Sequence, residues 1–223
     1  MRFILNNFFI FLFFISGPVY CENLNKKFSI KVSGIKIGEL VWAVQIDNNN
    51  YTNVIKLKSQ GLLSAIYRFE GYYFSKGIIA NNKLKPNNYS HVWKTNKTEK
   101  TMDLVFENGE LSSLNQTPHE KEKLRLDVFN IKQIKDPLSS FLEIIMGETN
   151  SLVVDGRRIY TMNAKFSKKN NKTVIDISDY SNLWADHKKN KFEHISFEKE
   201  EKILLPIKIN INFDGRVFKL EQN

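Results

Sequence analysis

The chain of 223 residues has 33 lysine and arginine residues against 24 aspartate and glutamate residues, a formal net charge of +9 at pH 7. These cations are dispersed through asparagine-rich stretches without interleaved aromatic residues, so the charge predicts no nucleic-acid partner, although peripheral contact with an anionic membrane stays open. The sequence contains 1 cysteine, which excludes a fold stabilised by internal disulfides, and a chain of this length can bury enough apolar surface without them.

The first element in chain order is an N-terminal leader. A short basic start precedes an apolar run at residues 8–15, and turn-forming residues end the run. This pattern predicts a signal peptide over residues 1–21, because the run is too short to cross a bilayer. Residues 22–223 are then expected to form a single β-rich exported domain, soluble in the bacterial periplasm. Lipidation of Cys21 is the less favoured alternative, because Tyr20 is not the small residue that such sites need before the cysteine.

Alternation of apolar and polar residues predicts strands along most of the remaining chain. They are expected at residues 28–32, 40–46, 54–58, 67–77, 89–95, 101–106, 151–154, 158–166, 173–178, 192–197, 205–213 and 217–220. The pairs Asn108-Gly109 and Asp214-Gly215 predict tight turns. Residues 62–66 predict either one helical turn or the start of the next strand.

One helix is expected, at residues 137–146. Asp136 can cap its N-terminus, Pro137 suits the first helical position, and Gly147 suits its end. Its apolar residues fall on one side, so the helix is expected to pack on a sheet. These residues are Leu138, Phe141, Leu142 and Ile145.

The predicted fold class is mainly β: a single curved antiparallel sheet or half-open barrel with one or two covering helices. One or two helices are too few to cover the apolar face of so many strands. The sheet must therefore curl toward a barrel or hold something apolar in its concavity.

No catalytic or metal-binding motif is readable. The histidines have no partners at zinc-ligand spacing and are expected on the surface; they are His91, His119, His187 and His194. Asp176 and Asp179 could bind a cation, but a polar turn explains them as well. A P-loop, a dinucleotide-binding glycine pattern and a metalloprotease motif are all missing from the sequence. We therefore expect no enzymatic activity, no cofactor and no metal.

Two segments resemble a known family. They are Asp136-Pro137-Leu138-Ser139-Ser140 and Val154-Asp155-Gly156-Arg157-Arg158-Ile159-Tyr160. The first resembles the helix start, and the second the turn between strands, of bacterial exported proteins known as domain of unknown function 3108. Supporting matches are Gly61-Leu62, Tyr67, Ser75-Lys76-Gly77, and Leu84-Lys85-Pro86 followed by Tyr89. Many members carry a cysteine where this chain has residues 179–189 and no cysteine, so no thiol role is expected.

The resemblance implies a fold like that of periplasmic lipoprotein carriers, in which a curved sheet wraps an apolar cavity lidded by helices. The helix at residues 137–146 is the expected lid. The candidate ligand-binding residues are Trp42, Tyr67, Phe69, Tyr73, Trp93, Phe141, Leu142, Ile145, Arg157 and Arg158. The two arginines would meet an anionic head group at the cavity mouth. The alternative is that the apolar residues form a filled core and an arginine pairs with a carboxylate.

We therefore expect a non-enzymatic periplasmic protein that binds a lipophilic ligand, such as an acyl chain, a lipid or a lipoprotein anchor. A scaffold or interaction partner in envelope assembly, with a filled core, is the alternative. An unrecognised hydrolase is the third hypothesis.

Overall fold

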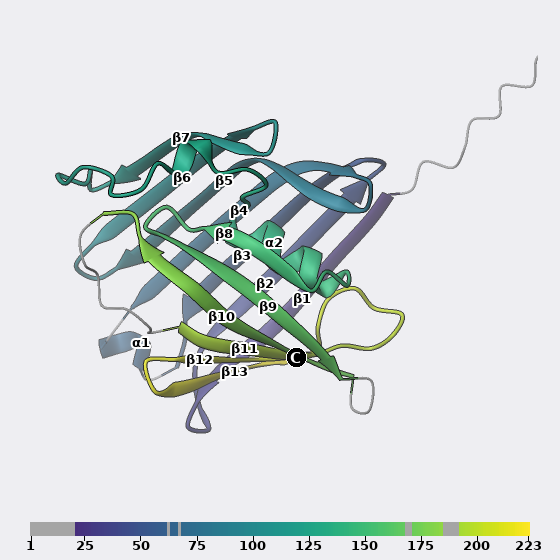
Figure 1. Ribbon diagram of the computed structural model, residues 1–223. Coiled ribbons are helices and arrows are strands. Elements are labelled where there is room, and N and C mark those ends of the chain that lie inside the picture. Colours follow the sequence, from purple (N-terminus) through teal and green to yellow (C-terminus); the bar gives the residue numbers. More distant parts are fainter. Residues whose placement is uncertain (1–20, 62, 67, 168–170, 185–191) are drawn as a thin grey trace, which may run out of the picture.

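The structure, a computed structural model, describes residues 21–61, 63–66, 68–167, 171–184 and 192–223 (Figure 1). Leu62, Tyr67 and His187, which the sequence analysis singled out, lie outside these residues. No helix within these ranges is long and apolar enough to cross a membrane.

The described residues form thirteen strands, two α-helices and one 3-10 helix. The strands are β1 (Cys21–Val32), β2 (Ile35–Asp47), β3 (Asn50–Ser59), β4 (Phe69–Ala80), β5 (Lys83–Thr95), β6 (Glu99–Glu107), β7 (Glu110–Thr117), β8 (Asn150–Val154), β9 (Arg158–Ser167), β10 (Lys172–Asn182), β11 (Phe192–Glu198), β12 (Lys208–Phe213) and β13 (Arg216–Gln222). The helices are α1 (Leu63–Ile66), η1 (Val128–Asn130) and α2 (Pro137–Ile145).

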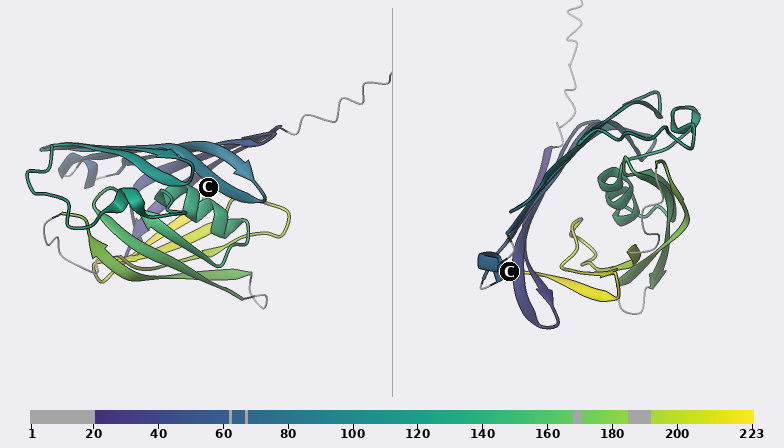
Figure 2. Two further views of the ribbon diagram at one scale, coloured as in Figure 1. Left: turned by 45° about the horizontal axis from the view of Figure 1, so that its top comes forward. Right: turned by 90° about the vertical axis from the view of Figure 1, so that its left-hand side faces the viewer.

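All thirteen strands belong to one sheet in which every pair of neighbouring strands is antiparallel. Strands β1 to β7 form one meander and β8 to β13 a second, and pairing of β1 with β13 joins them. The sheet curls strongly but does not close, because β7 and β8 are its two edges (Figure 2). This confirms the predicted fold class of a curved antiparallel sheet or half-open barrel.

Several strand predictions need correction, among them the starts of β2 and β5, which begin at Ile35 and Lys83 rather than at residues 40 and 89. Strand β7 was not expected, because a segment rich in serine, asparagine and glutamine carries little apolar alternation. Strand β1 begins at Cys21 rather than at residue 28, since its polar first half pairs fully with β2. The strand expected from residue 205 begins at Lys208, because the preceding Pro206 has no N–H to donate.

The turns and helices follow the local signals. Asn108 and Gly109 have φ values of 54° and 80°, the left-handed conformation that a two-residue hairpin turn needs. Residues 63–66 form one helical turn, which decides between the two alternatives for this segment. Helix α2 is capped by Asp136 and is followed by Gly147, whose φ is 120°.

Helix α2 lies inside the curl of the sheet (Figure 2). Leu142, Ile144 and Ile145 are at most 2% exposed and pack into the main core cluster. The sequence predicts a lid over the concavity, whereas the structure places the helix within it as a packed inner element. The physical reason is a set of buried polar contacts between the helix and the concave face of the sheet, described next.

Candidate functional site

A buried polar network fixes the N-terminus of α2 against the sheet. Oδ1 of Asp136 accepts hydrogen bonds from the backbone N–H groups of Leu138 and Ser139, at 2.9 and 3.0 Å. Its Oδ2 accepts from the hydroxyl groups of Ser75, at 2.9 Å, and Ser139. The hydroxyl of Tyr51 lies 2.7 Å from that of Ser139. Asp136, Ser75 and Ser139 are fully buried, so the helix start is part of the core.

Further contacts tie α2 to neighbouring strands. Asn53 donates to the carbonyl oxygen of Leu138 at 3.1 Å and accepts from the indole Nε1 of Trp42 at 2.7 Å. Near the other end of the helix, Glu143 accepts from the backbone N–H of Leu84 at 2.9 Å and forms an ion pair with Lys135. Helix α2 therefore has one fixed position within the concavity.

The concave face of the sheet presents ordered rows of side chains beside this helix. Trp42, Ile55, Tyr73, His91 and Met102 are successive cross-strand partners from β2 to β6. Directly opposed residues in antiparallel strands point to the same face, so these five side chains form one row. The next row contains Asn53 and Ser75, which bind α2.

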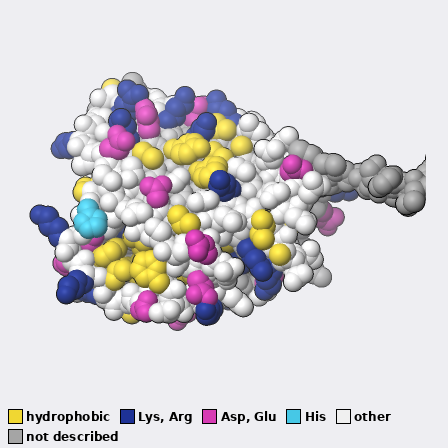
Figure 3. All heavy atoms as spheres, turned by 90° about the horizontal axis from the view of Figure 1, so that it is seen from above, with side chains coloured by type: hydrophobic (Ala, Val, Ile, Leu, Met, Phe, Trp, Pro, Cys, Tyr) yellow, Lys and Arg dark blue, Asp and Glu magenta, His cyan; other side chains and the backbone are white. Residues whose placement is uncertain are grey.

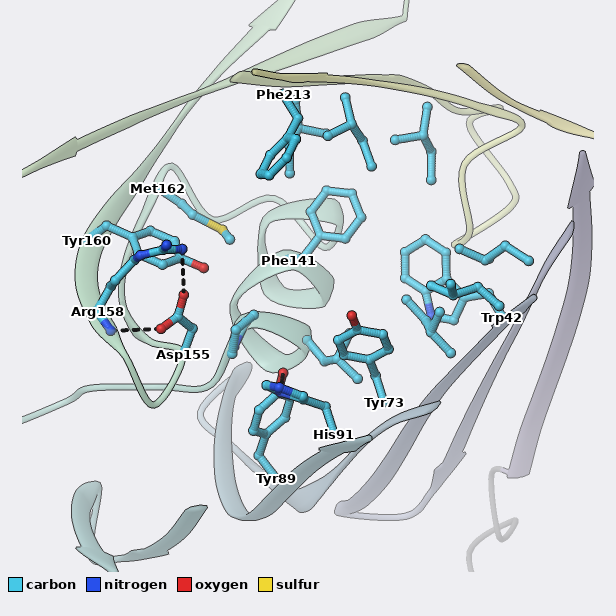
Figure 4. Close-up of a pocket in the computed structure, with 18 of the residues that line it drawn as sticks. Trp42, Tyr73, Tyr89, His91, Phe141, Asp155, Arg158, Tyr160, Met162 and Phe213 are labelled. Carbon is cyan, nitrogen blue, oxygen red and sulfur yellow. Dashed lines mark hydrogen bonds and ion pairs between the residues drawn. The ribbon is translucent and has the colours of Figure 1, made fainter. Parts of the chain in front are cut away.

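A cavity of about 470 Å³ lies between this row, α2 and strands β9 to β13 (Figure 4). It is lined by Leu40, Trp42, Ile55, Leu57, Tyr73, Tyr89, His91, Pro137, Leu138, Phe141, Asp155, Arg157, Arg158, Tyr160, Met162, Tyr180, Ile195, Ile209, Ile211, Phe213 and Leu220. Its volume falls in the range of about 300 to 1,000 Å³ that is typical of pockets for small molecules.

Most of the cavity wall is apolar. Phe141 of α2 stacks on Trp42 with ring centroids 5.5 Å apart, and it contacts Phe197 edge-on at 5.7 Å. Figure 4 shows Phe141 between Trp42 on one side and Met162 and Phe213 on the other. An apolar molecule in this space would contact aromatic rings and aliphatic side chains from both meanders.

The charged side chains of the cavity gather on one wall, around the turn between β8 and β9. The backbone N–H groups of Arg157 and Arg158 each donate to Oδ1 of Asp155 at 2.8 Å. Gly156 has a φ of 88°, and a Cβ atom there would lie 2.2 Å from the sulfur of Met102. This turn therefore requires both the aspartate and the glycine of the sequence motif.

The guanidinium groups of Arg157 and Arg158 donate no hydrogen bond to any residue that the structure describes. The nearest carboxylate contact of Arg158 is from Nη1 to Oδ2 of Asp155, at 3.9 Å. Its Nε is buried without a hydrogen-bond partner, and its guanidinium carbon lies 5.5 Å from the ring centroid of Tyr180. Two cations with unused donors therefore face the cavity.

His91 corrects the expectation that the histidines lie on the surface without partners. Its Nδ1 lies 3.0 Å from the hydroxyl of Tyr89, and its ring packs on Tyr73 at 5.3 Å. Burial and, second, the charge of Arg157 lower the pKa of His91 to about 4. His91 is therefore neutral at pH 7, with its imidazole on the cavity wall.

The wall has a positive charge at neutral pH. Burial raises the pKa of Tyr73 to about 12, and it raises those of Tyr89 and Tyr160 well above the usual range, so their hydroxyls stay protonated. Burial also raises the pKa of Asp155, against the opposing hydrogen bonds of its turn. Two positively charged guanidinium groups thus face at most one carboxylate. Protonation of that carboxylate would increase the net positive charge of the wall.

The structure brings together five of the ten predicted ligand-binding residues, since Trp42, Tyr73, Phe141, Arg157 and Arg158 line the cavity. Phe69 and Trp93 do not line it but stack on each other with centroids 5.6 Å apart. Leu142 and Ile145 are packed in the core.

The cavity residues that the sequence analysis did not predict include three tyrosines and one histidine. They are Tyr89, His91, Tyr160 and Tyr180. For two of them a signal was available, because Tyr89 and His91 alternate in phase with Trp93 along one strand. The tyrosines of β9 and β10 carried no comparable signal.

Outside the cavity, the described acids and histidines show no metal-binding cluster. Within the described part of the chain, no group of three or more histidine, cysteine, aspartate or glutamate side chains could hold a metal ion. Asp176 forms an ion pair with Lys165 at 2.8 Å, and Asp179 has a left-handed backbone with a φ of 52°. His119 is exposed. His194 of β11 is half-buried and is the cross-strand partner of Asp176 in β10.

On the face that Figure 3 shows, charged side chains of both signs are interspersed with small apolar groups. The cations of this face form no continuous stripe. This distribution agrees with the dispersed lysines of the sequence.

Comparison with solved structures finds a likeness to a protein from Brucella abortus described as a beta-barrel-like protein of domain of unknown function DUF1849. The alignment covers 92% of this chain and 98% of that chain, with 11% sequence identity and a TM-score of 0.51. At this identity the likeness concerns the fold alone, and it is consistent with the carrier-like curved sheet implied by the sequence motifs. A comparison with curated proteins finds no match.

A family model supports the resemblance that the sequence motifs suggested. The model described as "Protein of unknown function (DUF3108)" matches residues 27–185. The matched region includes the helix anchor at Asp136, the turn at Asp155 and most of the cavity wall. Because the match extends over more than half of the sequence, the chain belongs to the DUF3108 family.

Proposed function

We propose that this protein is a non-enzymatic binding protein of the bacterial periplasm that holds a lipophilic ligand within its curved sheet. The observation that carries the proposal is the cavity of about 470 Å³ lined mainly by apolar side chains. Exposed apolar surface is unfavourable by about 25 cal/mol per Å². An apolar ligand that displaces water from this wall would therefore bind favourably.

The cavity also favours binding over the scaffold hypothesis. A scaffold would have a filled core and an exposed apolar face or sheet edge as its working surface. Here the helix is held by Asp136 and Asn53 at a position that leaves open space beside Phe141. That space has the size and mixed lining of a small-molecule pocket.

Binding is also favoured over hydrolysis by the composition of the cavity wall. The described lining residues include no serine, threonine, cysteine or lysine, the side chains that most often act as nucleophiles. His91 lies in the cavity, but its nearest polar partner is the hydroxyl of Tyr89. We therefore assign the polar groups to ligand recognition.

Periplasmic location is part of the proposal and rests on the leader pattern at residues 1–21. Intact-mass measurement of the exported protein tests it. We expect a mature chain that begins at Glu22 and carries no lipid. A mass that includes a diacylglycerol-modified Cys21 would replace this part of the proposal with a lipoprotein.

Ligand binding is tested by native mass spectrometry of protein purified from its own periplasm. We expect a species heavier than the polypeptide, whose extra mass is released by organic extraction. A matched pair of variants locates the ligand. Ile55→Trp fills the cavity wall and should lower the bound fraction, whereas Ile35→Trp alters a side chain that is 61% exposed and should not. A bare polypeptide that also takes up no added lipid would contradict the proposal.

A further inference from the structure

We infer that the ligand is a single-chain amphiphile whose anionic head group is bound by Arg157 and Arg158. The inference rests on the proposed function and specifies the chemistry of its ligand. Three observations support it: the unused guanidinium donors, the hydrogen bonds that already occupy Asp155, and the shape of the cavity.

The first observation concerns the donors. An arginine presents five N–H donors in a planar fork that matches carboxylate and phosphate oxygens. Neither the guanidinium of Arg157 nor that of Arg158 donates a hydrogen bond to a described residue, and Nε of Arg158 is buried without a partner. A buried donor without an acceptor is unfavourable, so the wall is incomplete without oxygen atoms from a ligand or from water.

The second observation concerns Asp155, the acid closest to these cations. Its Oδ1 already accepts two backbone hydrogen bonds, each 2.8 Å long, and its Oδ2 stays 3.9 Å from the guanidinium of Arg158. The carboxylate therefore shapes the turn and does not saturate the arginines. A ligand carboxylate or phosphate could approach them without displacing an existing hydrogen bond.

The third observation is the distance between the charged wall and the aromatic wall that contains Trp42. In Figure 4, Arg158, Asp155 and Tyr160 lie on one side of the space, and Trp42 lies on the opposite side beyond Phe141. An amphiphile would place its head at the turn between β8 and β9 and its chain along Phe141 toward Trp42. With a volume of about 470 Å³, the cavity suits one drug-sized molecule and leaves little room for a second chain.

The experiment measures displacement of the neutral dye N-phenyl-1-naphthylamine from the full-length mature protein. The competitors are tetradecanoate, tetradecanol, a one-chain lysophosphatidylglycerol and a two-chain phosphatidylglycerol. We expect tetradecanoate, the lysolipid or both to displace the dye at concentrations at least about tenfold below those of tetradecanol. The carboxylate and the phosphate competitor distinguish a fatty acid from a phospholipid head group, and either preference supports the inference.

Variants identify the residues responsible. The double variant Arg157→Gln with Arg158→Gln should lower the affinity for the anion to that for the alcohol. The affinity for the alcohol itself should stay unchanged. Arg68→Gln is the matched control, because the Arg68 side chain is 70% exposed and pairs with Glu70 outside the cavity. Unchanged alcohol binding also shows that the double variant is folded.

The outcomes separate this inference from the proposed function. Equal displacement by tetradecanoate and tetradecanol would overturn the inference and leave a neutral lipophilic ligand in place. Binding of the two-chain lipid as tightly as the lysolipid would overturn the single-chain assignment. Failure of the dye and of every competitor to bind would overturn the proposed function together with the inference.

Discussion

The two family motifs use the same backbone arrangement in two different environments. Asp136 and Asp155 each accept hydrogen bonds at Oδ1 from the N–H groups two and three residues later. At Asp136 the second carboxylate oxygen is also occupied, by the hydroxyls of Ser75 and Ser139 in the core. At Asp155 it faces a loosely held guanidinium on a cavity wall. The first motif is therefore a closed anchor for a helix, and the second is an open support for ligand-binding groups.

The largest expected effect comes from breaking the closed motif. Asp136→Ala removes a helix cap, which contributes about 1 kcal/mol, and removes the carboxylate that accepts hydrogen bonds from the buried hydroxyls of Ser75 and Ser139, at about 1 to 3 kcal/mol for each bond lost. We expect the free energy of unfolding to fall by about 3 to 6 kcal/mol in urea titrations. Asp155→Ala should lower it by less, about 1 to 2 kcal/mol, because the turn is partly exposed. Equal losses for the two variants would contradict the difference between the motifs.

The next effect concerns the glycine of the open motif. Gly156→Ala places a side chain in left-handed backbone, at a cost of about 1 to 2 kcal/mol, and forces Met102 to move, at about 1 to 3 kcal/mol more. Gly215→Ala is the matched control, because its φ is 71° but nothing lies within 4 Å of an added Cβ. Thermal unfolding should show Gly156→Ala as the more destabilised variant. Similar losses for both variants would mean that Met102 adjusts freely.

Much of this fold could be predicted because its signals are local. Alternating residues placed most strands, and the Asp136-Pro137 pair placed the start of α2. The position of α2 inside the curl could not be predicted, because it depends on contacts such as Ser75 to Asp136 and Asn53 to Leu138. Those partners lie 61 and 85 residues apart in sequence, and no local pattern links them.

The site could be predicted only in part, for a related reason. Aromatic residues at inward strand positions are equivalent in sequence, yet Tyr73 lines the cavity whereas Phe69 and Trp93 cover each other. Which inward-facing side chain borders the cavity depends on where helix α2 ends. His91 was readable from its phase with Tyr89, but the surrounding polar residues suggested a surface location.

The third prediction concerns pH and the open motif. His91 has a pKa of about 4 in the folded state and about 6.5 when unfolded, so only the unfolded chain binds its proton between these values. Stability should therefore fall as pH decreases from 6.5 to 4, by up to about 3 kcal/mol from this residue. His91→Gln should remove that part of the pH dependence in urea titrations. His119→Gln, which alters an exposed histidine, is the control and should leave the profile unchanged.

Arg157 provides a sharper form of the same test. Its charge is the second cause of the low pKa of His91, after burial. Arg157→Gln should therefore raise the pKa of His91, measured by NMR titration of the imidazole, while leaving it below the usual value. An anionic ligand near Arg157 should also raise this pKa, so affinity for a phosphate head group, which stays ionised, should increase as pH falls from neutral toward 4. A pKa that is the same in the variant would mean that burial alone sets it.

The smallest expected effect on stability is the most informative about the open motif. Because neither guanidinium donates a hydrogen bond to a described residue, Arg157→Gln and Arg158→Gln should each change the free energy of unfolding by less than about 1 kcal/mol. Arg158 has the larger effect of the two, since its side chain is 24% exposed and packs over Tyr180. Such small losses, combined with loss of anion preference, would identify the arginines as groups maintained for a ligand. A loss of several kcal/mol would instead identify them as parts of the folded framework, like Asp136, and the two motifs would then be alike.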